Sequence, residues 1–334
     1  MQAIPPAAKT AGILAQKLMK TIQAQYHGDP FQLNQNPDLF AADQQILISV
    51  KAAGVNPVDT YIAAGTNGYT ATFPHTPGKD AAGVIIALGD KVSGFKVGQR
   101  VYCAGTLTGA SAELALASPA QVFPLPEALS FEQGACLGTP YATAWRALFI
   151  RANCQAAETV LIHGASGGVG LAAVQLAKAA GCKVFASAGS EQGCALLQQQ
   201  GADLVVNHHQ PEHYQQLQEA GAIEVVLEML ANQNLGDDLP LLNNGGRVVV
   251  IGSRGSVDIN PRDLMSKDAC IMGMSLAHAG PTQLTQIHAA LFAGAQAGFI
   301  KPVIAKRFAL AETTAAHVAV MKAGATGNIV INVP

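Results

Sequence analysis

The sequence predicts an α/β protein that combines an antiparallel, partly closed β-barrel with a doubly wound parallel sheet. Two observations lead to this prediction. Residues 17 to about 135 alternate short strand-like runs with Gly and Pro and show no long helical pattern, which is typical of antiparallel sheets. From residue 158 onward, strands and helices alternate in a regular order. Such βα repeats form parallel sheets with right-handed crossovers.

The parallel part begins with a strand, a turn of small residues and a helix. Residues 160–162 are an apolar run, and apolar residues recur with helical spacing over residues 169–180. The turn between them reads A-x-G-x-x-G from Ala165. Gly167 would let backbone approach a pyrophosphate, and Gly170 would let the helix pack closely on the strand. The helix N-terminus would face the phosphates. We interpret the motif as a dinucleotide site; the alternative is an ordinary tight strand–helix turn.

Six strand-like runs follow one another in this part, enough for one complete nucleotide-binding sheet. They cover residues 160–162, 183–187, 204–207, 224–227, 247–251 and 271–275, with helices expected at 193–200 and 213–219. Two later runs, KPVIAKRFAL and NIVINV, follow a helix expected at 283–294. The six-stranded sheet is complete without these two runs, so we expect them to be strands of the barrel. Helical residues 127–152 join the two parts, with Ser130 as N-cap and Gln133 completing a capping box.

Composition excludes several classes of protein. The 334 residues suggest about two domains. An apolar fraction of 49% and a charged fraction of 13% indicate a compact globular chain. The net charge of −2 gives no electrostatic argument for nucleic acid or an anionic membrane as partner. No apolar run reaches the length of a membrane span. The six cysteines form no C-x-x-C pair, so we expect most of them to be buried rather than bound to zinc or oxidised.

The N-terminal residues 1–16 are expected to form a loose extension ahead of the first strand. They show no basic region before an apolar core, so no signal or transit sequence is expected. The cytoplasm is the compartment that follows from this expectation.

Several segments resemble one family. They are GVNPVDTYIAAGT (54–66), PHTPGKDAAGVI (74–85), HGASGGVGLAAVQLA (163–177), EMLAN (228–232) and GSRGSVDINPRD (252–263). All of them are similar to zeta-crystallin-type quinone oxidoreductases, within the medium-chain dehydrogenase/reductase superfamily, and the resemblance extends from about Leu18 to the C-terminus. It implies a GroES-like catalytic domain (1–136 and 284–334), a Rossmann domain (137–283) and a cleft between them. It also implies NADPH as cofactor and a homodimer or homotetramer joined through the edge strand near 270–276.

The sequence departs from the zinc-dependent alcohol dehydrogenases of the same superfamily. Those enzymes carry Cys where this chain has Asn56, and Gly-His-Glu where it has Gly78-Lys79-Asp80. A protonated lysine cannot bind zinc, and asparagine is a poor substitute for a thiolate. The region of the structural zinc lobe holds only Cys103. A site without metal favours quinones and conjugated enones, which are already electron-poor, over simple ketones, which need a Lewis acid.

The resemblance assigns residues to the site. Tyr61 and Asn56 are the expected catalytic residues beside the nicotinamide, where a phenol could donate a proton. The alternatives are a packed tyrosine and a turn-forming asparagine before proline. The expected cofactor-binding residues are Tyr61, Ser166, Gly167, Gly168, Val169, Gly189, His208, Asn234, Ile251, Gly252, Ser253, Arg254, Met274, Ser275 and Leu276.

The end of the second parallel strand bears on the choice of cofactor. Enzymes that prefer NAD place an acidic residue there to accept a hydrogen bond from the ribose 2′-OH. Residues 187–190 read Ser-Ala-Gly-Ser, which favours NADPH. His208 is the expected partner of the 2′-phosphate, with Arg254 as a second candidate. Either residue could instead be a solvated surface side chain.

Two other functions stay open from the sequence. A 2-alkenal or enoyl reductase would share the fold, the cofactor and the metal-free site. A nucleotide- or RNA-binding or structural crystallin-like protein is the alternative of another class, although the near-neutral charge argues against RNA. Residues 67–72 depart from the family pattern in a loop that is expected to border the substrate.

Overall fold

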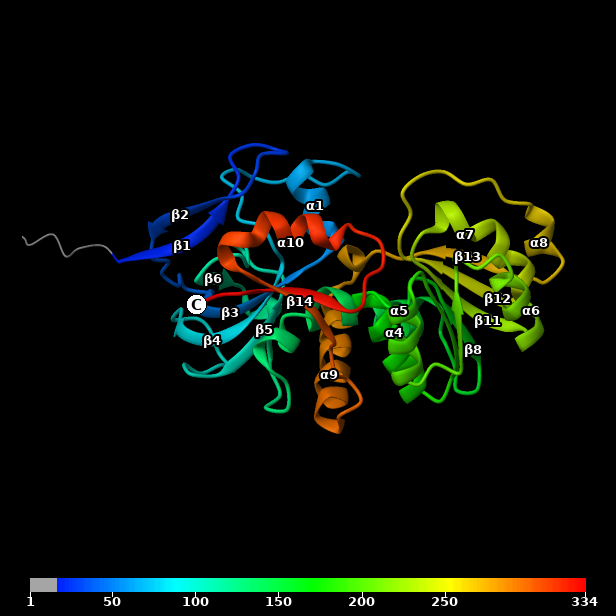
Figure 1. Ribbon diagram of the computed structural model, residues 1–334. Helices are drawn as coiled ribbons and strands as arrows, with labels where there is room; N and C mark the ends of the chain where they lie inside the picture. The colour runs from blue at the N-terminus through cyan, green and yellow to red at the C-terminus, as the bar shows by residue number, and fades with distance from the viewer. Residues whose placement is uncertain (1–16) are drawn as a thin grey trace, which may run out of the picture.

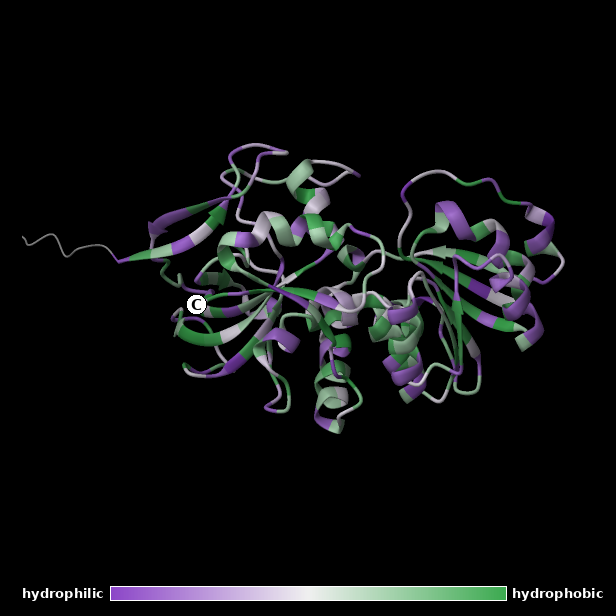
Figure 2. Cartoon of the chain, viewed as in Figure 1, coloured by the Kyte–Doolittle hydropathy of each residue, from purple (hydrophilic) through white to green (hydrophobic). Residues whose placement is uncertain are grey.

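The computed structural model describes residues 17–334, so the extension expected for residues 1–16 lies outside the described residues. Two large sheets organise the chain, and they lie side by side in Figure 1. In Figure 2, hydrophobic residues concentrate on the central strands of both sheets. None of the helices in residues 17–334 has the length and hydrophobicity needed to cross a membrane.

The seven-stranded sheet contains both the N-terminal strands and the last two strands of the chain. Its order is β14-β15-β3-β4-β5-β7, with β6 paired to β3. The pairs are antiparallel except β14 with β15, which run parallel. The return of the two late strands is therefore confirmed. The bounds are β3 (Ile46–Val55), β4 (Asp80–Leu88), β5 (Arg100–Ala104), β6 (Leu114–Ala117), β7 (Val122–Pro124), β14 (Ile304–Ala309) and β15 (Asn328–Asn332).

A separate two-stranded sheet precedes it. Strands β1 (Leu18–Gln23) and β2 (Gln32–Pro37) pair antiparallel. The β2 sequence QLNQNP is largely hydrophilic and mostly exposed. Single bridges from Thr21 and Ala24 tie this hairpin to the segments at Ala112 and His75.

The six-stranded sheet is parallel throughout, with the order β10-β9-β8-β11-β12-β13. All six predicted strands are present, in the doubly wound order of a nucleotide-binding sheet. The bounds are β8 (Thr159–Ile162), β9 (Lys183–Ala188), β10 (Leu204–Asn207), β11 (Ile223–Glu228), β12 (Leu242–Val250) and β13 (Cys270–Gly273).

The edge strand is shorter than expected. It ends at Gly273, and Leu276–His278 forms a 3₁₀ turn, so Met274, Ser275 and Leu276 lie beyond the strand rather than on it. Met274 turns into the core with 9% of its surface exposed, and its N–H donates to the Val250 carbonyl at 2.9 Å. Because the Met274 side chain is buried, the chain leaves the sheet edge at this residue.

Helices cover both faces of the six-stranded sheet and connect the two parts (Figure 1). The predicted domain boundary between residues 283 and 284 falls within helix α9. The positions of both domain boundaries stay predictions. The bounds are α1 (Pro57–Ala64), α2 (Phe131–Gly134), α3 (Ala142–Trp145), α4 (Gly168–Ala179), α5 (Glu191–Gln199), α6 (His213–Ala220), α7 (Ala231–Asp238), α8 (Pro261–Met265), α9 (Pro281–Ala297) and α10 (Thr313–Val320).

The helical segment that joins the parts is not one regular α-helix. Ser130 caps α2 as predicted, since its hydroxyl accepts from the Gln133 N–H at 3.2 Å and Gln133 accepts in return from the Ser130 N–H at 3.0 Å. Leu137–Tyr141 and Arg146–Arg151 are π-helical and flank α3. Pro140 lies in the first π segment. Proline lacks an N–H and crowds the preceding turn, so the chain widens there.

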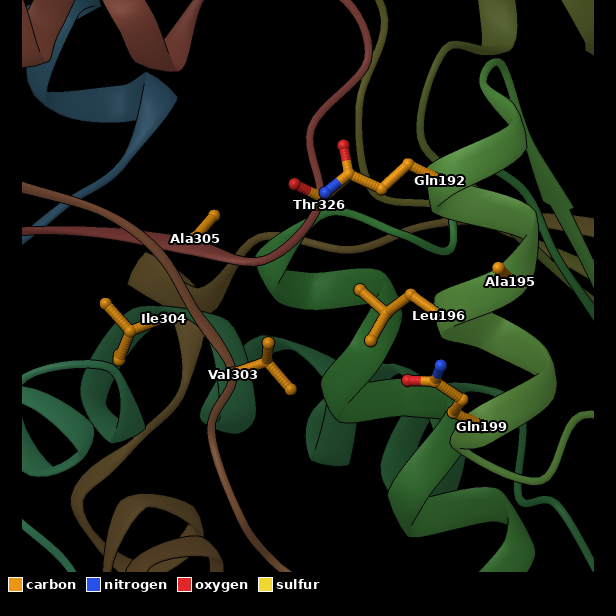
Figure 3. Close-up of a pocket in the computed structure, with 8 residues that line it drawn as sticks. All are labelled: Gln192, Ala195, Leu196, Gln199, Val303, Ile304, Ala305 and Thr326. Carbon is orange, nitrogen blue, oxygen red and sulfur yellow. The ribbon is translucent and has the colours of Figure 1, made fainter.

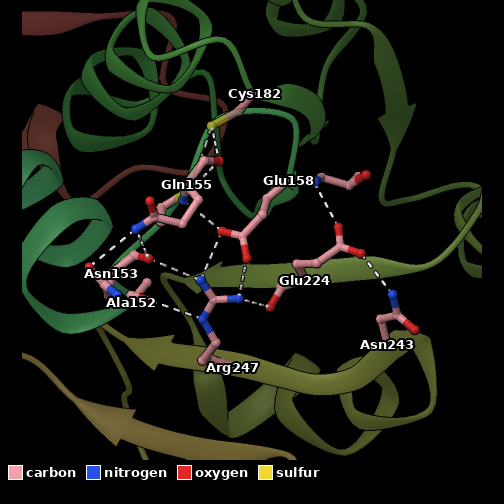
Figure 4. A network of polar contacts seen from close by, with 10 residues as sticks. Ala152, Asn153, Gln155, Glu158, Cys182, Glu224, Asn243 and Arg247 are labelled. Atoms are coloured by element: carbon pink, nitrogen blue, oxygen red, sulfur yellow. Dashed lines mark hydrogen bonds and ion pairs between the residues drawn. The ribbon is translucent and has the colours of Figure 1, made fainter.

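A polar network holds the amino ends of the parallel strands, on the side away from the glycine turn (Figure 4). Arg247 forms two hydrogen bonds of 2.8 Å with the Glu158 carboxylate and donates from Nε to the Ala152 carbonyl at 2.9 Å. Glu224 accepts from the Thr159 N–H at 2.7 Å. Planar two-point pairing of this kind fixes geometry as well as charge, so it anchors the end of the π-helical segment to β12.

The cysteines largely follow the sequence expectation. Among the residues described, all six are free thiols, and four are buried while Cys194 is half-buried and Cys270 exposed. Burial raises the pKa of Cys103 to about 12, which makes it an unreactive core residue.

Candidate active site

The glycine turn lies where the strand order of the parallel sheet reverses. Strands β8 and β11 are neighbours there, and open α/β sheets bind ligands at the carboxyl ends of such strands. The Ala165 N–H donates to the Ser187 carbonyl at 2.8 Å, which fixes the turn against β9. Gly167 is the N-cap of α4, with an extended backbone of φ −79° and ψ 174°. The N-terminus of α4, from Gly168 through Val169, therefore opens toward the crevice.

Two glycines of the motif differ in what surrounds them. A Cβ on Gly170 would meet the backbone of Ala165, with the carbonyl oxygen 2.6 Å away. A Cβ on Gly167 would have the Gly164 oxygen at 3.5 Å as its nearest neighbour. Gly170 is thus needed for packing, whereas Gly167 leaves space for a ligand. Ser166, between turn and helix, is buried at 5% exposure.

The tips of β9 and β10 bring two histidines against Gly189. A Cβ on Gly189 would lie 2.5 Å from Nε2 of His208 and 3.0 Å from Nε2 of His209. The two rings contact each other edge to face, with centroids 4.7 Å apart. Burial lowers the pKa of His208, and the neighbouring His209 lowers it further. The predicted pair of Gly189 and His208 is therefore brought together. His209 also contacts this pair, although it was not among the expected residues. Only its position next to His208 in the sequence could have indicated it.

The other half of the crevice is formed by the ends of β11 and β12. Asn234, on α7, donates from Nδ2 to the Glu228 carboxylate at 3.1 Å. Ile251 donates its N–H to the Glu228 carbonyl at 2.8 Å, and the Gly252 N–H donates to the same oxygen at 3.2 Å. Ser253 and Arg254 are exposed on the turn that follows, where the Arg254 N–H donates to Asn232 Oδ1 at 2.8 Å. These predicted residues lie on one wall.

Across from this wall, the seven-stranded sheet contributes a buried polar cluster around Asn56. Asn56 is the N-cap of α1, and its Nδ2 donates to Asp80 at 2.9 Å. The Asp80 carboxylate also accepts from the N–H of Thr139 at 2.8 Å and from its hydroxyl at 3.0 Å. Asp59 accepts from the Asn56 N–H at 2.8 Å. Burial raises the pKa of Asp80 to about 6 and that of Asp59 to about 7.

Asn56 and Asp80 are two positions at which the sequence departs from its zinc-dependent relatives, and their side chains are hydrogen-bonded to each other. Their neighbours in the sequence connect to the glycine turn, because Pro140 follows Thr139 and its ring would lie 3.6 Å from a Cβ on Gly168. Sequence reasoning missed Asp59 and Thr139. The spacing N-P-x-D, with proline at the first helical position, was the available signal for Asp59.

Tyr61 lies one turn into α1 and is half-buried. Its ring stacks with Tyr69 at a centroid distance of 6.4 Å, so the 67–72 loop does border the predicted catalytic tyrosine. The neighbouring Thr60 hydroxyl contacts Sδ of Met321 at 3.4 Å. The chain then runs to Gly327, which bridges to Gly167. The loop between these residues therefore links α1 to the glycine turn.

The pocket shown in Figure 3 lies beside this crevice rather than in it. It has a volume of about 360 Å³ and lies between α5 and the start of β14. None of its lining residues is among those expected to bind the cofactor. They are Gln192, Ala195, Leu196, Gln199, Val303, Ile304, Ala305 and Thr326.

A second buried polar cluster lies directly beneath the crevice. Among the residues that the structure describes, His163, Glu228 and Asp238 are the one group whose potential metal-binding atoms all lie within 4.8 Å of one another. Sequence reasoning did not predict it, because the three residues are spread over 76 positions and have no ligand spacing. His163 is hydrogen-bonded to Asp238 and lies within ion-pair distance of Glu228.

Comparisons with known proteins agree with this geometry. The alcohol dehydrogenase GroES-like domain family matches residues 42–127, and the zinc-binding dehydrogenase family matches residues 168–292. The quinone oxidoreductase of Mus musculus is 46% identical over 95% of this chain and 98% of its own length. That of Rattus norvegicus is 47% identical over 90% of this chain and 94% of its own length.

Solved structures show the same fold. The quinone oxidoreductase from Thermus thermophilus, also solved in complex with NADPH, is 28% identical, with a TM-score of 0.84 over 94% of this chain and 100% of the other. The CurK enoyl reductase is 27% identical, with a TM-score of 0.85 over 95% of this chain and 99% of the other. The chain belongs to the zeta-crystallin-type quinone oxidoreductase family of the medium-chain dehydrogenase/reductase superfamily.

Proposed function

We propose that this chain is an NADPH-dependent quinone oxidoreductase that works without zinc. The observation that carries the proposal is the crevice itself. A glycine turn and a strand tip without carboxylate form one side of it, and Thr139 and Pro140 connect this turn to the hydrogen-bonded pair of Asn56 and Asp80. The high identity to quinone oxidoreductases over nearly the whole chain supports it.

The residues of the crevice fit NADPH. Gly167 leaves room for the pyrophosphate, and the free N–H groups at the start of α4 would bind it. Gly189 with His208 would receive the 2′-phosphate. Asn234, the 251–254 turn and residues 274–276 would line the nicotinamide half. When bound, NADPH would supply the hydride for the reduction.

On the substrate side, the protein's own groups would position an electron-poor ring and supply a proton. Asp80 holds the Asn56 amide through one of its two N–H hydrogens, which fixes the amide at the nicotinamide end of the crevice. Tyr61 offers a phenol as proton donor to a substrate oxygen and a ring face for stacking. Tyr69 extends that aromatic surface.

The purified protein is expected to oxidise NADPH in the presence of ortho- or para-quinones and to do so after exhaustive dialysis against a chelator. An enone of the acrolein type is the comparison substrate, since the similarity to an enoyl reductase makes reduction of conjugated enones the second candidate. Faster turnover of enones than of quinones would favour that candidate. No NADPH oxidation above the blank with any quinone or enone would contradict both.

His208 is expected to make NADPH binding pH-dependent. Because burial lowers its pKa, the imidazole is neutral at pH 7 and gains its proton when it meets a phosphate dianion. The affinity for NADPH should therefore rise as the pH falls from about 8 to about 6.5. Replacing His208 with Ala should weaken NADPH binding about tenfold. Isothermal titration over this pH range measures both effects.

NADH and the His213→Ala variant serve as controls. NADH lacks the 2′-phosphate, so its affinity should not follow pH or the His208 substitution. His213 lies on α6 and bonds to the Gln210 carbonyl, so its removal should leave both cofactors unaffected. Parallel pH profiles for NADPH and NADH would show that His208 does not contact the phosphate.

The assembly and location also belong to the proposal. Strand β13 ends the order of the six-stranded sheet, and an unpaired strand edge can pair with a second copy. We therefore propose a homodimer or homotetramer joined near residues 270–276, in the cytoplasm, with neither nucleic acid nor membrane as a primary partner.

A further inference from the structure

We propose that His163, Glu228 and Asp238 form a positioning cluster that holds the nicotinamide-side wall of the crevice. This inference rests on the proposed function, because it concerns how the cofactor of that reaction is bound. The three residues come from different elements, at the end of β8, the end of β11 and the end of α7. They meet at the switch point of the parallel sheet.

The cluster is almost completely buried. His163 is 3% exposed, and Glu228 and Asp238 are 0% exposed. Nε2 of His163 lies 2.7 Å from Oδ1 of Asp238 and 3.8 Å from Oε2 of Glu228. On the other side of the ring, Nδ1 lies 3.1 Å from the Ser187 hydroxyl. Each ring nitrogen therefore has a partner.

Charge explains why the three groups stay together. Two carboxylates without a cation would be costly at this depth. Burial opposes the charge of His163, but Asp238 and Glu228 outweigh it and raise the pKa of the imidazole. Burial also raises the pKa of Glu228 to about 7. The cluster thus retains protons near neutral pH, and removal of one member would leave the other two poorly compensated.

Glu228 transmits this arrangement to the crevice wall. Its carboxylate accepts hydrogen bonds from the Leu230 N–H and from Asn234 Nδ2, while its carbonyl accepts from the N–H groups of Ile251 and Gly252. One residue therefore fixes the start of α7 and the turn after β12. Both segments lie on the β11–β12 side of the switch point, which in a doubly wound sheet receives the nicotinamide half.

The adenine half has contacts of its own and meets the cluster where Nδ1 of His163 lies 3.1 Å from the Ser187 hydroxyl of β9. It is formed by the tips of β9 and β10, where Gly189 packs against His208 and His209. Neither Glu228 nor Asp238 contributes a hydrogen bond to those tips in the described structure. A defect in the cluster should therefore affect the two halves of the cofactor unequally, which general destabilisation would not do.

The test compares two ligands on two variants. We expect Glu228→Gln and Asp238→Asn each to weaken NADPH binding about tenfold or more. The same variants should bind 2′,5′-ADP, which has only the adenine half, within twofold of the unaltered protein. Glu224→Gln is the matched control, since Glu224 lies at the opposite end of β11 and also accepts a backbone hydrogen bond. It should change neither affinity.

Three results would overturn the inference. They are NADPH affinities within twofold of normal in the folded variants, an equal loss for NADPH and 2′,5′-ADP, and failure of both variants to fold. The last two would assign the cluster a general structural role. If one variant does not fold, the other decides by the same comparison. Failure of the unaltered protein to bind NADPH would contradict the proposed function instead. The affinities of the same variants for NADH and for ADP would then test the cluster.

Discussion

Replacing Gly167 with alanine is expected to remove most cofactor binding while leaving the fold intact. The backbone of Gly167 is extended, at φ −79°, so alanine can adopt it. The new methyl group would meet no protein atom closer than 3.5 Å, but it would enter the space proposed for the pyrophosphate. An overpacked contact of this kind costs about 1–3 kcal/mol, or roughly 5–150-fold in affinity. Titration with NADPH measures the loss of affinity, and thermal unfolding measures whether the fold keeps its stability.

Gly170→Ala is the matched comparison, with the opposite expectation. Its Cβ would lie against the Ala165 backbone, 2.6 Å from the carbonyl oxygen. Since backbone cannot move aside as a flexible side chain can, α4 must shift from the turn, at a cost of about 3 kcal/mol of stability. The two variants therefore separate the ligand role of one glycine from the packing role of the other. Equal stability losses in both would contradict this division.

The glycine turn and the parallel sheet could be predicted because local signals coincide with the final structure. Residues 204–207 are a strand in both the prediction and the structure. A short apolar run between two helices is buried most easily as a strand of the sheet that the helices cover. The antiparallel part followed from the absence of long helical patterns. The parallel pairing of β14 with β15 was not foreseen, because it depends on how the chain returns after α10.

The segment around Pro140 shows where local reasoning ends. The capping box at Ser130 is a short-range signal and was predicted correctly. The π-helical turns after it are not encoded by a periodic pattern. They combine the proline with packing of this segment against α4 and against the Asp80 cluster through Thr139. Such contacts link residues far apart in sequence.

The buried polar clusters illustrate the same limit at the site. Asn56 could be named as a candidate from its residue type, but the hydrogen bond from Asn56 to Asp80 joins residues 24 positions apart. Glu228 lies in a segment that resembles the family, but nothing in its residue type predicts a role in the site. Its partners His163 and Asp238 became apparent when the strands were placed side by side. Residue types gave candidates, and topology gave the pairs.

Replacing Asp80 with asparagine is expected to change how stability depends on pH. Burial raises the pKa of Asp80 from 3.8 to about 6 in the folded protein, so the folded state holds a proton that the unfolded chain has already lost. The free energy of unfolding of the unaltered protein therefore falls as the pH rises from about 4 to about 6. At 1.36 kcal/mol per pKa unit, this loss amounts to about 3 kcal/mol. Asparagine does not titrate.

The stability of the Asp80→Asn variant relative to the unaltered protein should consequently increase by about 3 kcal/mol between pH 4 and pH 7. A constant penalty of about 1–3 kcal/mol is expected on top, because one donor of Thr139 or Asn56 loses its acceptor. Urea unfolding at several pH values separates the pH-dependent gain from the constant penalty. Asp43→Asn is the control, because Asp43 forms an exposed pair with Lys91.

A difference that does not vary with pH would mean that folding does not raise the pKa of Asp80 and would contradict this prediction. A difference that grows with pH would mean that Asp80 is a carboxylic acid at mildly acidic pH in the folded protein. In that state its O–H becomes a donor, and Asn56 must turn its oxygen rather than its nitrogen toward it. The amide would then turn its N–H groups away from Asp80.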